Sequence, residues 1–368
     1  MAESPKLWKL SQAFHLECGT TLPEIEIAYH TYGQLSPEGD NVVWVCHALT
    51  GNSEAADWWD GLVGVGKLFD PEHYFIVCAN ILGSCYGSTG PLSINPANGK
   101  AYGHSFPLIT VRDMVAAHEL LREELGIQKI HVALGGSMGG QQVLEWAIQK
   151  PDLFEHLVLL ATNAQHSPWG IAFNESQRMA IYSDSTLLEE NHPEAGKKGL
   201  ETARSIAMLS YRSYDTYQLS QTDDADKLED FRASSYQRYQ GLKLWRRFNV
   251  FSYLTLSRAM DSHNVGRGRD GVEKALQAVK AKTLVIGIAT DILFPIREQE
   301  EIAKGIPAAQ YTVLESIFGH DGFLVEFQRI ETLIRLFLFS PEAKVDASPR
   351  PSQAWTVSNV ALPGSEKF

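Results

Sequence analysis

Hydrophobic positions along the chain follow two alternating periods. Six continuous apolar runs have the length and composition of strands that are covered on both faces, as in a parallel sheet. They are NVVWVCHAL (41–49), HYFIVCANI (73–81), KIHVALGG (129–136), HLVLLAT (156–162), KTLVIGI (282–288) and QYTVLE (310–315). Segments with a helical period occur at 110–126, 139–151 and 326–339. Such alternation predicts a mostly parallel central sheet that is flanked by helices.

Two further regions depart from this alternation. Residues 14–35 read as two strands around a Thr-Leu-Pro turn, and the alternating polarity of the second strand predicts an antiparallel edge. From Thr162 to about Lys280 the chain is polar, helical in period and rich in tyrosine, which indicates an inserted helical cap. The expected organisation is a core in two parts (1–164 and 281–340), a cap (165–280) and a poorly ordered tail (341–368).

Composition narrows the class of protein. The chain has 368 residues, of which 44% are hydrophobic, and a formal net charge of −12 that disfavours binding to nucleic acid or to anionic membranes. No stretch reaches the roughly 18 apolar residues of a membrane helix, and the start does not resemble a signal peptide. The four cysteines lack metal-ligand spacing. We therefore expect a soluble, cytoplasmic protein that acts on small molecules and holds no metal.

The segment Gly135–Gly139, GGSMG, carries the clearest chemical signal. It follows a strand and precedes a helix, which is the context of the G-x-S-x-G nucleophile elbow, where glycines permit a sharp turn that exposes a serine. The serine could instead cap a helix, or the loop could cradle a phosphate, but the spacing fits neither a dinucleotide fingerprint nor a Walker A loop. The pattern predicts Ser137 as a nucleophile.

Acid and base candidates follow the elbow in the expected order. Asp291 comes shortly after one apolar strand, and His320 lies in a loop after the next. This order of serine, aspartate and histidine is that of an α/β-hydrolase triad. The oxyanion hole is expected to use the backbone N–H groups of Met138, which follows the nucleophile, and of Leu49, in the loop after an earlier strand. His47 precedes the elbow, and we interpret it as a residue that shapes that loop.

Several motifs together resemble the homoserine O-acetyltransferases of the α/β-hydrolase superfamily. They are HALTGNSEAADWW, ANILGSCYGSTGPLSINP, GGSMGGQQVLEWA, ARSIAMLSYRS, DSHNVGRGR and GHDGFL, and they extend in order to about Phe339. The resemblance implies transfer of an acetyl group from acetyl-CoA to the side-chain hydroxyl of L-homoserine, through an acyl-serine and ping-pong kinetics, as a step toward methionine. It also implies a homodimer formed through the helical cap, with acetyl-CoA as a co-substrate and no permanently bound cofactor.

The resemblance also assigns roles to residues of the cap and of the histidine loop. Arg204 and Tyr211 match positions associated with the acceptor carboxylate, with Arg212 as a neighbouring candidate, and Asp321 matches the position that meets the acceptor ammonium. Arg204 and Tyr211 could otherwise belong to a solvated or packed helix face, and Asp321 could be a helix cap. The family has no fixed phosphate motif for coenzyme A. The candidates are the loop 266–271 (GRGRDG), Lys243, Arg246 and Arg247, each of which could also be ordinary surface.

Alternatives remain open at this stage. The sequence has Gly322 where alanine is frequent in the family, and GNSEAADWW is a variant of the segment near the acyl chain. Homoserine O-succinyltransferases and serine O-acyltransferases also occur on this scaffold. A serine esterase or thioesterase would have the same triad, and a non-catalytic relative that binds a ligand or partner is a further possibility.

Overall fold

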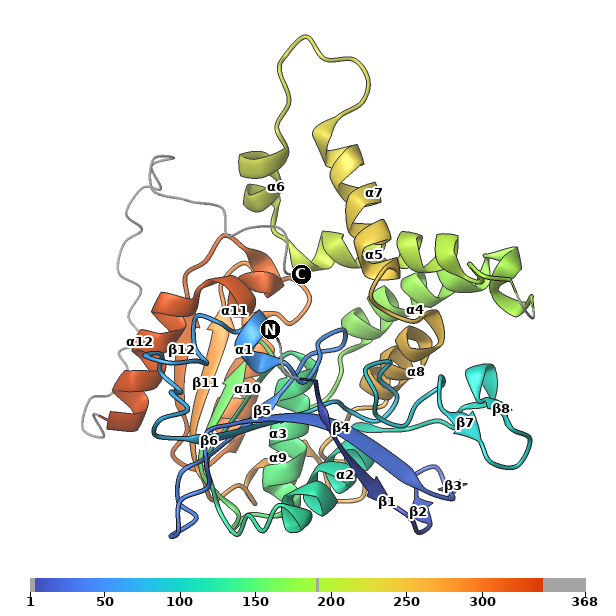
Figure 1. Ribbon diagram of the computed structural model, residues 1–368. Coiled ribbons are helices and arrows are strands. Elements are labelled where there is room, and N and C mark those ends of the chain that lie inside the picture. The colour runs from blue at the N-terminus through green and yellow to red at the C-terminus, as the bar shows by residue number, and fades with distance from the viewer. Residues whose placement is uncertain (1–3, 190–191, 340–368) are drawn as a thin grey trace.

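An eight-stranded sheet forms the centre of the computed structural model, which describes residues 4–189 and 192–339 (Figure 1). From edge to edge, its strands are β1 (Lys6–Leu10), β4 (Ile25–Tyr32), β6 (Phe75–Ala79), β5 (Val42–Cys46), β9 (Ile130–Gly136), β10 (Phe154–Leu160), β11 (Lys282–Ile288) and β12 (Gln310–Leu314). β4 is antiparallel to β1 and β6, and every pair from β6 to β12 is parallel. The predicted parallel sheet with an antiparallel edge is confirmed.

The sequence pattern does not reveal the shorter elements outside this sheet. They are the hairpin strands β7 (Ile94–Asn95) and β8 (Lys100–Ala101) and helix α1 (Ala55–Trp58). Edge strand β1 is also missing from the prediction, because its five residues, KLWKL, are mostly exposed and lack an apolar run. Each of these elements is too short to show a hydrophobic period. Of the two strands expected at 14–35, the second is β4, whereas the first is limited to β2 (Phe14–His15), which pairs with β3 (Thr21–Leu22) at the expected turn.

Helices cover both faces of the sheet (Figure 1). One face packs on α2 (Val111–Glu124), α3 (Met138–Gln149) and α10 (Ile296–Gly305), and the other on α1, α11 (Gly322–Val325) and α12 (Phe327–Phe339). Neighbouring residues of β5 divide between the faces: Trp44 packs edge-on against Trp146 of α3, whereas Val45 belongs to the cluster on the α12 side. Burial on both sides is the reason that the strand sequences are continuously apolar.

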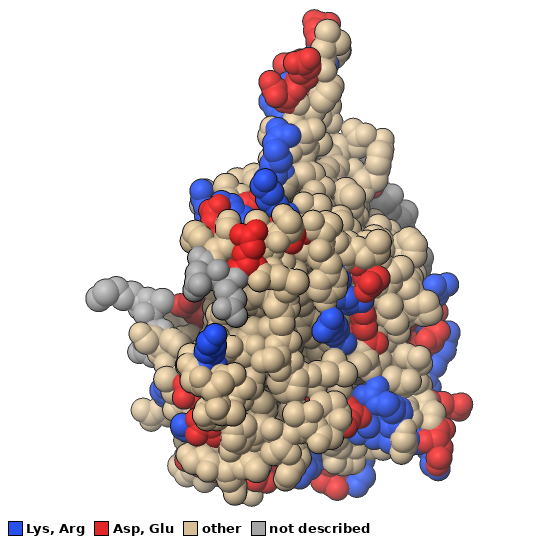
Figure 2. Space-filling view, turned by 90° about the vertical axis from the view of Figure 1, so that its right-hand side faces the viewer, with Lys and Arg blue, Asp and Glu red and all other residues tan. Residues whose placement is uncertain are grey.

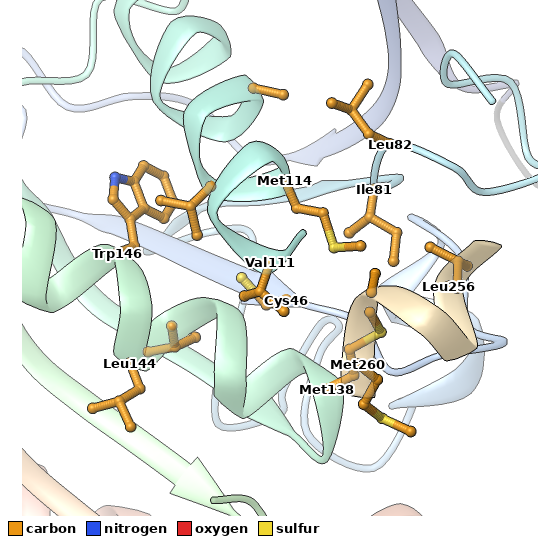
Figure 3. Packing of buried hydrophobic residues seen from close by; sticks show 14 of the residues in the cluster. Cys46, Ile81, Leu82, Val111, Met114, Met138, Leu144, Trp146, Leu256 and Met260 are labelled. Carbon is orange, nitrogen blue, oxygen red and sulfur yellow. The ribbon is translucent and has the colours of Figure 1, made fainter. Parts of the chain in front are cut away.

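Six α-helices stand between β10 and β11 among the described residues, in the region that was expected to be a cap. The first five are α4 (Pro168–Tyr182), α5 (Lys197–Tyr211), α6 (Tyr214–Gln221), α7 (Arg232–Trp245) and α8 (Val250–Asp261). α6 and α7 project away from the rest of the molecule (Figure 1), and Figure 2 shows acidic side chains at the tip of this projection. α8 instead packs on the core, where Met260 and Leu256 lie beside Met138 in one buried cluster (Figure 3). The chain then reaches α9 (Val272–Leu276), whose Leu276 side chain lies against Gly305 of α10.

Two further expectations concern the C-terminal tail and membrane-spanning helices. The predicted tail, 341–368, lies outside the described residues. Within the described residues, no helix is both long enough and apolar enough to cross a lipid bilayer.

Four buried histidines predict how stability depends on pH. Burial lowers the pKa of His47, His118 and His166 to about 4 and that of His263 to about 3. These side chains are therefore neutral in the folded state but take up protons in the unfolded chain below a pH of about 6.5. The free energy of unfolding is therefore highest above that pH. It decreases as the pH falls toward 4, by about 1.4 kcal/mol per histidine and pH unit. Denaturant unfolding followed by circular dichroism should give a clearly smaller free energy at pH 5 than at pH 7, and equal values would contradict the assignment.

Candidate active site

The carboxyl ends of the parallel strands bring the predicted triad residues to one edge of the sheet. Ser137 directly follows β9, Asp291 lies three residues beyond β11, and His320 follows β12 in a short 3-10 helix, Gly319–Asp321. Ser137 and His320 line the same cavity of about 180 Å³, and Asp291 contacts the ring of His320. The cavity also reaches residues of the loop after β5, of α5, of the segment after α7 and of α11. The structure therefore brings together triad residues that are up to 183 positions apart in the chain.

Ser137 occupies a strained backbone position between β9 and α3. Its φ of 57° and ψ of −127° lie in a region that residues other than glycine rarely adopt, and such strain costs roughly 1–3 kcal/mol. Two hydrogen bonds from outside the turn hold the residue: its N–H donates to Leu160 O (3.0 Å), and the hydroxyl of Thr162 donates to its carbonyl oxygen (2.7 Å). The turn leaves the serine at the cavity wall and at the start of α3, as a nucleophile elbow requires.

Glycines are required at the elbow because the backbone packs against itself there. A Cβ atom on Gly139 would lie 2.1 Å from Cys46 O, and one on Gly135 would lie 2.4 Å from the carbonyl carbon of Gly139. These contacts involve main-chain atoms, which cannot rotate away as a side chain can. The close approach also holds the start of α3 against the end of β5, which carries the predicted oxyanion loop.

We expect Gly139→Ala to destabilise the fold by about 3 kcal/mol, because the added methyl group overlaps the main chain. Gly322→Ala is a matched control: its Cβ would meet only side-chain ends at 3.2 Å, in a residue with helical φ and ψ. The control should change the free energy of unfolding by less than about 1 kcal/mol. Chemical denaturation of both variants measures the difference, and similar losses would contradict this account of the elbow.

Asp291 holds the imidazole of His320 in a defined orientation. The Nδ1–H group of His320 donates to Asp291 Oδ2 at 2.6 Å, and the other carboxylate oxygen accepts the backbone N–H groups of Leu293 (2.8 Å) and Phe294 (2.9 Å). The ring of Phe294 stacks on the imidazole, with 5.0 Å between centroids. Because Nδ1 carries the proton in this arrangement, Nε2 is the nitrogen that can accept one.

The side chains of His47 and Arg247 hold the loop after β5 in place. His47 donates from Nδ1 to Ala48 O (2.8 Å) and accepts the N–H of Ile81 at Nε2 (3.2 Å), so both ring nitrogens are engaged. Arg247 donates to Thr50 O (2.6 Å) and to Thr50 Oγ1 (3.2 Å). His47 is thus a structural residue of this loop. Leu49, the predicted oxyanion residue between these anchors, lines the cavity.

Arg204 is a buried cation that lines the cavity and has no carboxylate partner among the described residues. Only 5% of its surface is exposed, and its guanidinium lies 5.2 Å from the ring centroid of Tyr211, seven residues further along the chain. Burial raises the pKa of the Tyr211 phenol, which therefore stays protonated and can donate a hydrogen bond. A buried charge is stable when it is paired, so the arrangement favours an anionic ligand group.

Asp321 and Arg212 form an ion pair at the other side of His320. Arg212 Nε lies 2.7 Å from Asp321 Oδ2, and the charge of Asp321 acts against burial to raise the pKa of Arg212. Asp321 also lines the cavity, whereas Arg212 does not. Of the two neighbouring arginines, Arg204 is therefore the one available to a ligand.

The candidates for coenzyme A binding differ in their partners and in whether they line the cavity. In the loop 266–271, Arg267 pairs with Glu17 (2.8 Å) and Arg269 with the buried Glu145 (2.5 Å), so both cations hold the fold together. Arg246 is exposed, and Arg247 lines the cavity. Arg247 is thus the candidate that faces the space beside Ser137.

Some cavity residues were not singled out from the sequence. They are Tyr86, Phe323 and Leu324, together with Asp57 and Trp58, which belong to the segment that the sequence placed near the acyl chain. Tyr86 accepts a hydrogen bond from Arg247 (3.1 Å). Nothing in the local pattern marks these side chains, because their neighbours across the cavity come from distant parts of the chain.

Among the described residues, one group could offer ligands to a metal ion. It consists of His131, Glu155 and His156, whose ligand atoms lie within 4.8 Å of one another. These residues stand at the amino ends of β9 and β10, and Ser137 follows the carboxyl end of β9. The group therefore lies at the opposite edge of the sheet and takes no part in the chemistry at Ser137.

Known proteins resemble this chain in sequence and in fold. The family model described as the alpha/beta hydrolase fold matches residues 41–327. A curated homoserine O-acetyltransferase of Cyclobacterium marinum is 52% identical over 332 residues, which cover 90% of this chain and 94% of the relative. A solved homoserine O-acetyltransferase of Bacillus anthracis superposes with a TM-score of 0.85 at 25% identity, over 94% of this chain and all of that one. The solved esterase E22 superposes with a TM-score of 0.83 at 24% identity, over 91% of this chain and 99% of that one.

Proposed function

The chain belongs to the homoserine O-acetyltransferase family of the α/β-hydrolase fold, and from that membership we propose that it moves an acetyl group from acetyl-CoA to the side-chain hydroxyl of L-homoserine. Ser137 acts as the nucleophile, His320 as the base that later returns the proton, and Asp291 as the carboxylate that orients and stabilises the imidazole. The backbone N–H groups of Leu49 and Met138 form the oxyanion hole. The product would serve the synthesis of methionine in the cytoplasm.

The first half-reaction acylates the serine. His320 Nε2 takes the proton of the Ser137 hydroxyl while Oγ attacks the thioester carbonyl carbon. The oxyanion that forms is stabilised by the two N–H groups. The carbon–sulfur bond then breaks, and the CoA sulfur leaves with the proton from His320. Asp291 stabilises the imidazolium during this step through its hydrogen bond to Nδ1.

The second half-reaction transfers the acetyl group to the acceptor. The hydroxyl of homoserine attacks the acyl-serine, His320 takes its proton, and the same proton returns to Ser137 Oγ as the ester bond breaks. Water can compete at this step, so the acceptor must be held in line with the ester. Such positioning can be worth an effective concentration of roughly 10⁵–10⁸ M.

The buried Arg204, which has no carboxylate partner among the described residues, is the observation that favours a transferase over a hydrolase. Its guanidinium, with the Tyr211 hydroxyl, would bind the α-carboxylate of homoserine, and Asp321 would meet the ammonium group. Asp321 keeps this capacity beside Arg212, because a carboxylate has two oxygens and the ion pair engages Oδ2. A simple ester substrate would give this cation no partner.

An assay of thiol release that crosses two donors with two acceptors tests the specificity. Acetyl-CoA and succinyl-CoA are combined with L-homoserine and L-serine, and the free thiol is measured. We expect the pair of acetyl-CoA and homoserine to give the largest kcat/KM. A faster reaction with succinyl-CoA or with serine would reassign the donor or the acceptor, and thiol release that ignores both acceptors would indicate a thioesterase.

The projecting helices α6 and α7 support the proposal of a homodimer. They leave large side chains in solvent, including Tyr214 (75% exposed), and the loop between them does so with Leu228 (87% exposed). Exposed apolar groups on a projection typically mark a contact surface. Sedimentation of the intact chain should give the mass of two copies, and Leu228→Asp should shift the equilibrium toward one copy.

A further inference from the structure

A chain of buried polar side chains connects the nucleophile elbow with the helix that follows the acid loop. It runs through the two residues Thr162 and Asn163, which come directly after β10, and ends on Glu298 and Gln299 in the first turn of α10. All four side chains are buried, with at most 7% of the residue surface exposed. No step of the proposed mechanism uses them, although burying polar groups is costly unless they are hydrogen-bonded.

The link through Thr162 uses one residue to hold two elements. The Thr162 hydroxyl donates to the carbonyl oxygen of Ser137 (2.7 Å), and the side-chain amide of Gln299 donates to Thr162 O (2.5 Å). The strained turn at the nucleophile is thereby joined to α10 through a single intermediate residue.

The link through Asn163 is parallel to the first and uses both ends of one amide. Asn163 Oδ1 accepts from the side chain of Gln141 in α3 (2.9 Å), and Asn163 Nδ2 donates to Glu298 Oε2 (2.9 Å). The backbone oxygen of Asn163 also accepts from the ring of His263, just beyond α8 (3.1 Å). Asn163 therefore connects the elbow helix, α10 and the end of the cap.

The start of α10 is rigidly connected to the acid and the base. Asp291 Oδ1 accepts the N–H groups of Leu293 and Phe294, and the N–H of Glu298 donates to Pro295 O (2.8 Å). Phe294 in turn stacks on the ring of His320. A shift of α10 would move Asp291 and His320 relative to Ser137, and a misplacement of about 1 Å can cost roughly 100-fold in rate.

We infer that Asn163 and Glu298 are positioning residues, which set the distance between the nucleophile elbow and the loop of the acid and base. The inference rests on the triad proposed above. Burial and the charge of Asp291 raise the pKa of Glu298, while the hydrogen bond from Asn163 lowers it. The direction of that hydrogen bond, from amide to carboxylate, is what the test reverses.

Three variants separate this role from a general effect on folding. Asn163→Asp places a carboxylate against Glu298 and should lower kcat roughly 100-fold. The KM values of both substrates should stay within about twofold of those of the wild type. Glu298→Gln alone keeps an acceptor oxygen and should cost less. The double variant N163D/E298Q restores the pair with donor and acceptor exchanged, and the net charge of the pair is that of the wild type. We expect its kcat to return to within about fivefold of the wild type.

Rates are expressed per active site, counted by covalent labelling of the serine. Asn95→Asp in the partly exposed strand β7 serves as the matched control. Wild-type turnover by Asn163→Asp, or a double variant no faster than Asn163→Asp, would overturn the inference. A variant with fewer labelled sites but an unchanged rate per site would also overturn it, since Asn163 would then affect folding only. Failure of the wild type to form an acyl adduct on Ser137 would instead reject the proposed triad.

Discussion

Replacing Ser137 with alanine is expected to lower acetyl transfer at least about 10⁴-fold, because the variant lacks the hydroxyl that is proposed to carry the acyl group. In the wild type, incubation with acetyl-CoA and no acceptor should attach one acetyl group to the peptide that contains Ser137. Mass spectrometry of the digested protein measures the adduct. Addition of homoserine should then remove it and yield the acetylated amino acid.

The matched control is Ser176→Ala, which removes an exposed hydroxyl of α4 that is bonded only to its own helix. This variant should form the adduct and turn over as the wild type does. An intact Ser137 peptide after incubation with acetyl-CoA would exclude the acyl-enzyme, as would full activity of Ser137→Ala. Asp291→Asn should give an intermediate defect, since it removes the charge that stabilises the imidazolium of His320.

Replacing Arg204 with leucine should impair transfer of the acetyl group to homoserine but leave the acylation of Ser137 in place. The variant loses the cation that is proposed to bind the acceptor carboxylate, and removal of one partner of a buried charge pair costs roughly 2–5 kcal/mol. We therefore expect kcat/KM for homoserine to fall by about 30- to 5,000-fold. Acylation of Ser137 by acetyl-CoA should persist, and the adduct should be lost slowly to water. The measurements are transfer with varied homoserine and thiol release without an acceptor.

Arg238→Ala is the control for charge, because Arg238 is an exposed cation of α7 that does not line the cavity. It should leave both rates unchanged. If Arg204→Leu used homoserine as the wild type does, the acceptor carboxylate would bind elsewhere, and Arg204 would no longer favour a transferase over a hydrolase. If the variant no longer acylated Ser137, Arg204 would act on the donor instead.

The strands that carry the site were predictable because each is covered on both faces and is therefore a continuous apolar run. The triad residues were predicted for a related reason: each follows such a strand, and the carboxyl ends of parallel strands share one edge of the sheet. Short elements such as α1 and the β7–β8 hairpin were missed, although α1 contributes Asp57 and Trp58 to the cavity. With four residues, α1 has no period to detect.

The buried polar links were also invisible in the sequence. Asn163 follows a predicted strand, and Glu298 lies in a segment for which the sequence predicted no helix or strand. Their contact joins positions 135 residues apart and depends on how α10 packs against β11. Hydrogen bonds of this kind leave no periodic trace, because a single side chain on each element is enough to form them.

The amino-acid sequence by itself determined the nucleophile elbow and the order of acid and base, because backbone strain at Ser137 is a local property that demands glycines within a few positions. The tertiary structure alone decided which cations are available to a ligand. Arg212, Arg267 and Arg269 are neutralised by carboxylates from distant segments, such as Glu145 for Arg269, whereas Arg204 and Arg247, which line the cavity, have none among the described residues. Charge pairing depends on proximity in space, and the order of residues along the chain does not specify it.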